Sequence, residues 1–160
     1  MYNLEEYKNL ASKYGSFASW AIWDYQNQSD PSIIERNINE LNSKFVLLGL
    51  NISRPLANET WSNFHRGPNN IRKLKDACNN TKLRGSYITD IFKGIVEQQA
   101  IIFQDLLTDD LIKENVNLFD QEMNDIKLND GSQFIILGTQ ESLLAGYFKN
   151  YFQPKYKNNT

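Results

Sequence analysis

Short apolar runs separated by helical patterns constrain this chain most. Residues 45–48 and 134–137 are continuous apolar stretches, each followed at once by a glycine, Gly49 or Gly138. Such a run is typical of a strand buried on both faces, because a strand with one solvent-exposed face would alternate apolar and polar residues. Residues 83–91 are rich in β-favouring side chains and predict another strand that ends near Asp90. The chain therefore contains at least three strands of a covered sheet.

Apolar residues at helical spacing lie before, between and after these strands. Gly15 can end the first helix, and Asp30 followed by Pro31 is a suitable start for the second. Thr108 and Thr139 are plausible caps of two later helices. The predicted helices are residues 3–14, 31–41, 71–77, 96–107, 109–126 and 139–151. This alternation predicts an α/β protein, a three-layer α/β/α architecture with a central, mainly parallel sheet.

Length and composition narrow the class of protein. The 160 residues, 41% of them hydrophobic, suffice for one compact core, so we expect a single domain over residues 1–160. A net charge of −2 gives no global attraction to nucleic acid, so such binding would need a local basic surface. Cys78 is the only cysteine, which is consistent with a reducing compartment. We interpret it as a small packing residue. Without a leader pattern or a run of roughly 20 apolar residues, we expect a cytoplasmic protein with no membrane partner.

Common catalytic and cofactor motifs are missing from the sequence. It contains no CxxC, HExxH, Walker or GxGxxG pattern, so neither a metal nor a cofactor is expected. His65 is the only histidine, and no GxSxG accompanies it, which disfavours a serine or cysteine nucleophile mechanism. An unrelated α/β nucleotide-binding protein is disfavoured because no phosphate loop is present.

Candidate site residues gather where the predicted strands end. In such sheets ligands bind beyond the carboxyl ends of the strands, which places the loops after Leu50, near Asp90 and after Gly138 together. Asn51 and Ser53 offer polar side chains at these strand ends, and Asp90 could accept hydrogen bonds from a ligand. The alternative is local: Asn51 would satisfy nearby backbone groups and Asp90 would cap a turn.

An aromatic cluster follows in the loop after the first predicted strand. Trp61, Phe64 and His65 could form a stacking platform for a planar ring. Equally, these side chains could attach the loop to the core. The sequence of the loop alone leaves both interpretations open.

Three ordered motifs resemble the uracil-DNA glycosylase superfamily over roughly residues 15–152. They are Leu48-Gly49-Leu50-Asn51-Ile52-Ser53, Tyr87-Ile88-Thr89-Asp90-Ile91-Phe92-Lys93 and Phe134-Ile135-Ile136-Leu137-Gly138. The resemblance implies a DNA-repair hydrolase that flips a base out of DNA and cleaves its N-glycosidic bond. Asn51 matches the residue that positions water, and Asp90 matches the amide that reads the base edge. Phe64, with Trp61 in reserve, would stack on the base, and Ser53 and His65 would line the pocket.

The chain departs from this family's pattern at three places. Ile52 stands where a proline is usual, and Asp90 replaces an amide, which would favour a base edge bearing an amino group. The sequence ends at residues 155–160, where another strand and a histidine-containing loop would be expected. We therefore expect either a C-terminally truncated enzyme or a catalytically inactive binding or regulatory module. The partners expected are single-stranded, damaged or mismatched DNA and, for the second alternative, a protein.

Overall fold

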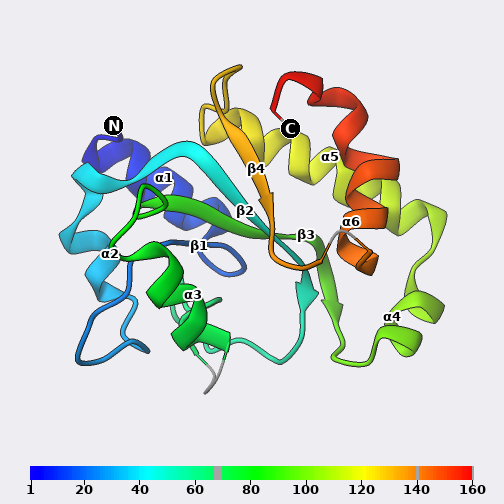
Figure 1. Ribbon diagram of the computed structural model, residues 1–160, viewed down its shortest axis with the longest axis horizontal. Helices are drawn as coiled ribbons and strands as arrows, with labels where there is room; N and C mark the ends of the chain where they lie inside the picture. Colours follow the sequence, from blue (N-terminus) through cyan, green and yellow to red (C-terminus); the bar gives the residue numbers. More distant parts are fainter. Residues whose placement is uncertain (67–69, 140, 160) are drawn as a thin grey trace.

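A computed structural model describes residues 1–66, 70–139 and 141–159 of the protein (Figure 1). The strands are β1 (Ser19–Trp20), β2 (Asn42–Ile52), β3 (Ser86–Val96) and β4 (Gln133–Ile136). The α-helices are α1 (Leu4–Tyr14), α2 (Ser32–Arg36), α3 (Asn70–Cys78), α4 (Ala100–Leu106), α5 (Asp109–Asp125) and α6 (Leu143–Tyr147). A 3₁₀ turn η1 (Ile38–Glu40) follows α2, and η2 (Phe148–Phe152), η3 (Gln153–Lys155) and η4 (Lys157–Asn159) follow α6.

One open, mixed sheet organises the fold, with the strand order β1-β3-β2-β4. β2 pairs in parallel with both β3 and β4, so the two long strands lie at the centre. β1 adds an antiparallel edge that the sequence did not predict, because a two-residue strand has no recognisable period. The α/β class is thus confirmed, and two of the three strand pairings are parallel.

Helices cover both faces of this sheet, as the alternation of side chains requires. Val46, Leu48 and Tyr87 point into a large core with α1, α5, α6 and the segment after α6. Leu47 and Ile88 point to the opposite face, where α3 and Trp23 complete a smaller core. In Figure 1, α3 and the α1–α5 pair lie on either side of the central strands. Both faces of β2 are therefore covered at residues 46–48, which explains the continuous apolar run of that strand.

Gly15 ends α1 as predicted, but it does so in an ordinary right-handed conformation, with φ of −62°. The requirement for glycine comes from packing instead. A Cβ at this position would lie 2.5 Å from Ala11 O and 2.5 Å from Thr60 Cγ2. The Gly15 carbonyl also accepts a 2.6 Å hydrogen bond from Trp61 N, so a loop distant in sequence is attached here.

Several predicted boundaries were wrong for identifiable reasons. The helix predicted over residues 31–41 breaks at Asn37, which has φ of −129°. β3 continues to Val96 and shortens the next predicted helix to α4. Ser142 caps α6 instead of Thr139, because the Ser142 hydroxyl accepts a hydrogen bond from Ala145 N. The strand predicted to be buried at residues 134–137 is half-buried, since β4 is a sheet edge.

Among the described residues, no helix combines the length and apolar character needed to cross a membrane.

Candidate functional site

A cavity opens at the carboxyl ends of the parallel strands, where the sequence predicted a site. Its volume is about 790 Å³, within the range typical of small-molecule and cofactor sites. It lies at the end of β2, beside Gln98 after β3 and Leu137 after β4. Asp90 also lines it, but from the middle of β3, because that strand continues to Val96 and does not end near Asp90 as predicted. Its remaining walls come from the loop after β2 and from α3. The lining residues are Gly49, Leu50, Asn51, Ile52, Ser53, Arg54, Asn63, Phe64, Arg66, Ile71, Leu74, Asp90, Gln98 and Leu137.

Asp90 is the buried charged group of this cavity. Its side chain extends across the neighbouring strand, where Gly49 is its register partner. A Cβ at Gly49 would lie 2.1 Å from Asp90 Oδ1, so only glycine leaves room for the carboxylate. Asp90 is 4% exposed, and burial raises the pKa of its carboxyl to about 6, while the Asn63 hydrogen bond and Lys93 lower it. A partly protonated carboxyl can both donate and accept hydrogen bonds near neutral pH.

Phe64 supplies an aromatic wall next to this carboxylate. Its ring atom Cε1 lies 3.4 Å from the position that a Gly49 Cβ would take. The backbone of Phe64 is left-handed, with φ of 63°, a conformation that costs on the order of 1–3 kcal/mol for a residue other than glycine. The surrounding contacts must therefore hold the ring in place against this strain.

Trp61 and His65 supply those contacts from inside the protein. Trp61 is 1% exposed, and its indole Nε1 donates a 3.2 Å hydrogen bond to Tyr7 Oη. His65 is fully buried and stacks on Trp23 with ring centroids 5.2 Å apart. Trp23 Nε1 donates in turn to the Phe64 carbonyl at 3.0 Å. Neither Trp61 nor His65 lines the cavity; both attach the loop that presents Phe64.

Burial in this position lowers the pKa of His65 to about 4, so the imidazole is neutral near pH 7. Its Nε2 lies 3.2 Å from the Ile22 carbonyl and its Nδ1 has no hydrogen-bond partner among the described residues. A neutral, enclosed ring of this kind cannot exchange protons with a ligand in the cavity.

Asn51 lies on β2 and lines the cavity, although the sequence placed it in a loop after the strand. Its Nδ2 lies within hydrogen-bond distance of three backbone carbonyls: Ile52 at 3.1 Å, Ile95 at 3.3 Å and Glu97 at 2.8 Å. These contacts join the ends of β2 and β3 and fix the plane of the amide. Oδ1 is the atom of Asn51 that remains to bind a ligand or water. Ser53 lies at the exposed rim.

Sequence reasoning missed Asn63, which connects the loop to the strands. Its Nδ2 donates to the Phe17 carbonyl at 2.7 Å and to Asp90 Oδ2 at 3.0 Å, and its Oδ1 accepts from Phe64 N at 3.1 Å. It thus positions both the carboxylate and the ring. Its place between Ser62 and Phe64 gave no sign of this, because the contacts reach residues 46 and 27 positions away.

The rim of the cavity is basic. Arg54 and Arg66 line it, and α3 carries exposed Arg72 and Lys73 beside the apolar residues that face inward. Residues 53–84 contain seven Lys or Arg and two Asp or Glu. Residues 97–125 contain one Lys and eight Asp or Glu. Arg66 is paired with Glu59 at 2.5 Å, so Arg54 on the rim and Arg72 and Lys73 on α3 supply the remaining local positive charge of a protein with a net charge of −2.

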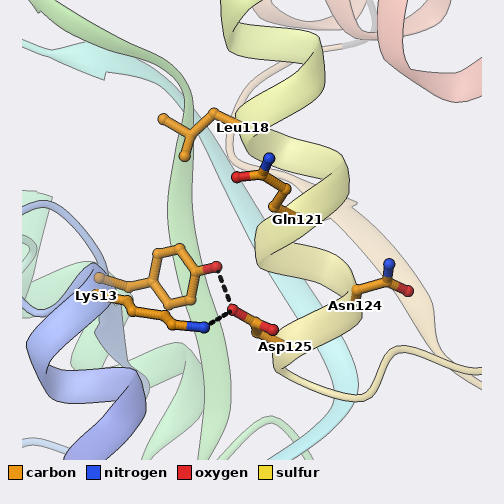
Figure 2. A pocket seen from close by; sticks show the side chains of 6 residues that line it. Lys13, Leu118, Gln121, Asn124 and Asp125 are labelled. Carbon is orange, nitrogen blue, oxygen red and sulfur yellow. Dashed lines mark hydrogen bonds and ion pairs between the residues drawn. The ribbon is translucent and has the colours of Figure 1, made fainter.

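A second hollow, of about 430 Å³, lies between α1 and α5. Figure 2 shows Lys13, Gln121, Asn124 and Asp125 around it. Lys13 Nζ donates to Asp125 Oδ2 at 2.8 Å and Tyr14 Oη donates to the same atom at 2.7 Å, so its charged groups already satisfy each other. The strand-end cavity is the better candidate site. Within the described ranges, no cluster of three or more His, Cys, Asp or Glu side chains is placed to hold a metal.

Comparisons with protein-family models, with curated proteins and with solved structures found no match to this chain.

Proposed function

We propose that this protein binds a base extruded from DNA, in the manner of the uracil-DNA glycosylases that its motifs resemble. The observation that carries this proposal is the strand-end cavity, where Phe64 and Asp90 lie together. Aromatic stacking and hydrogen bonds to the base edge are the two contacts by which proteins hold a flipped base. A size of about 790 Å³ suits a nucleoside.

The basic rim supports a nucleic acid as the source of that base. Phosphates of a strand passing the cavity would meet Arg54, Arg66 and the outer face of α3. Each phosphate neutralised releases counterions, so binding by this surface would weaken steeply with salt. The acidic α4–α5 segment would repel the same strand.

Hydrolysis of the N-glycosidic bond is the activity proposed for this site. Asn51 Oδ1 would accept a hydrogen bond from water and orient its oxygen toward the sugar carbon. The bond between that carbon and the base nitrogen breaks and its electron pair leaves with the base, while the water oxygen forms a new bond to the carbon. One proton of the water is finally transferred to the base. Arg54 and Gln98 line the cavity as N–H donors for the negative charge that develops on the base.

Binding without cleavage is the second candidate, and one observation favours it. The only histidine of the chain is fully buried behind Trp23 and does not line the cavity. The imidazole that stabilises the leaving base in the resembled enzymes has no counterpart among the described lining residues. A binding or regulatory module would use the same cavity without the chemical step.

Oligonucleotides carrying uracil and other altered bases, single-stranded and mispaired, separate these alternatives. Binding is measured by fluorescence anisotropy, and abasic product by alkaline cleavage. Product that disappears in Asn51→Ala, with binding and circular dichroism retained, supports the hydrolase. Binding without product supports the module. If neither product nor binding is seen at high protein concentration, both are wrong.

Two sets of variants connect the readout to the site. Phe64→Gly removes the ring but tolerates the left-handed backbone, so it should weaken base binding while the protein stays folded. Tyr25→Ala, an aromatic that is 62% exposed and distant in sequence, is the matched control. The slope of the logarithm of the binding constant against the logarithm of the salt concentration reports phosphate contacts. Arg54→Gln and Lys73→Gln should each reduce its size by about one, whereas exposed Lys149→Gln should leave it unchanged.

A further inference from the structure

Asp90 offers the cavity one unused oxygen. Its Oδ2 accepts a 3.0 Å hydrogen bond from Asn63 Nδ2, whereas none of the hydrogen bonds among the described residues reaches Oδ1. That oxygen lies above Gly49, 2.1 Å from where a Cβ would be, on the wall that Phe64 also forms. A ligand lying against Phe64 would therefore place its edge at Asp90 Oδ1.

Two of the amide side chains that line the cavity already use their donors within the protein. Asn63 uses Nδ2 for Phe17 O and Asp90 Oδ2, and its Oδ1 accepts from Phe64 N, so its amide cannot turn toward a ligand without losing these bonds. Asn51 directs its Nδ2 to the carbonyls at the ends of β2 and β3. When Asp90 is ionised, the part of the cavity formed by Asp90, Asn63 and Asn51 accepts hydrogen bonds from a ligand edge but offers it no donor.

We propose that Asp90 selects a planar base whose edge carries an exocyclic amino group, the edge that cytosine and adenine share, over a base that presents only carbonyl oxygens and a ring N–H. This inference rests on the proposed function. An amino N–H would donate to Asp90 Oδ1. In uracil or hypoxanthine the ring N–H is the only donor of that edge, and a carbonyl oxygen next to it would lie beside the carboxylate, with its lone pairs unpaired and repelled in a buried place.

The selectivity depends on the charge of Asp90. Lys93 on the same strand and the Asn63 hydrogen bond favour the ionised form, while burial and Glu122 on α5 oppose it, and the pKa is about 6. Above that pH the carboxylate is an acceptor only. Below it the protonated carboxyl gains a donor and can also bond a carbonyl, so the preference for amino edges should decline as the solution becomes more acidic.

Direct binding of single-stranded oligonucleotides tests this inference. They are identical except for one 2′-fluoro nucleotide carrying cytosine, adenine, uracil or hypoxanthine, or an abasic analogue, and the 2′-fluoro group keeps the glycosidic bond intact. At pH 7.5 we expect the cytosine or adenine strand to bind about tenfold or more tightly than the uracil and hypoxanthine strands, the effect of one unpaired buried polar group. Asp90→Asn supplies an amide donor and should reverse this order. Asp76→Asn, the same charge change at an exposed position of α3, should not.

Equal or tighter binding of the uracil strand by the parent protein would overturn the inference and leave the proposed function standing. An unchanged order of affinities in Asp90→Asn would overturn it too. If all four bases bind no better than the abasic analogue, the proposed base-binding function itself fails, and the inference fails with it.

Discussion

Asp90 Oδ1 lies only 2.1 Å from the position that the Cβ of any other residue would take at Gly49. The two residues are paired in the parallel register of β2 and β3. The buried carboxylate can therefore take its position in the cavity only because the neighbouring strand has no side chain at residue 49.

Gly49→Ala should destabilise the protein by about 1–3 kcal/mol, because the added methyl group forces the buried carboxylate or the strands to move. Chemical denaturation measures this cost. In an Asp90→Ala background the cost should shrink, since the clashing oxygen is gone. Gly146→Ala, on α6 with nothing within 4 Å of its Cβ, is the control and should be neutral or slightly stabilising. A similar cost of Gly49→Ala in both backgrounds would contradict this relationship.

Asp90→Asn should raise the stability of the protein at neutral pH. The pKa of this carboxyl is raised to about 6, so the folded state holds its proton more tightly than the unfolded state does. Parent stability therefore falls as pH rises from about 4 to about 6, by on the order of 3 kcal/mol. The free energy of unfolding of the variant, measured across this range, should lack that fall. A parallel pH dependence in both proteins would argue against a buried ionised Asp90.

His65 should contribute the opposite pH dependence. Its pKa is lowered to about 4, so protonation favours the unfolded state, and stability is lost as pH falls from about 6.5 toward 4. Because it is the only histidine, its ring signal in proton NMR is unambiguous. We expect no titration of that signal in the folded protein between pH 8 and about pH 5. A midpoint near 6.5 would mean that the ring is accessible to solvent and that the loop is not anchored as described.

Breaking the buried ion pair between β3 and α5 should be costly. Lys93 Nζ lies 2.6 Å from Glu122 Oε2, with side chains 6% and 0% exposed, and Tyr87 Oη donates to the other carboxylate oxygen at 2.7 Å. Lys93→Met should destabilise by about 3–5 kcal/mol, because it leaves Glu122 buried and without its cation. Urea denaturation of the double variant Lys93→Met/Glu122→Leu should show a smaller cost than the single change.

The exposed pair Lys13–Asp125 is the control for this prediction. Its N–O distance of 2.8 Å is similar, but its side chains are 48% and 32% exposed. Lys13→Met should change stability by less than about 1 kcal/mol, because water already screens the charges. If both lysine variants cost the same, burial is not what gives the Lys93–Glu122 pair its importance.

The α/β class, the central strands and the end of the sheet at which a cavity opens could all be predicted from the sequence. Each follows from a local pattern: apolar runs closed by glycine at Gly49, helical spacing between them, and the rule that parallel strands end on the same side. It also identified Asn51, Phe64 and Asp90, which line one cavity. To predict that these three residues lie close together, it was enough to know the order of the strands and the position of the loop that follows the first predicted strand.

The role of each aromatic and amide side chain became visible only with the folded chain. Trp61 and His65 are as suitable for stacking as Phe64 by composition, yet they are buried because Tyr7 and Trp23, distant in sequence, pack against them. The role of Asn63 likewise depends on contacts with Phe17 and Asp90. Side-chain direction in an irregular loop depends on long-range packing and hydrogen bonds, and these contacts leave no periodic trace in the sequence.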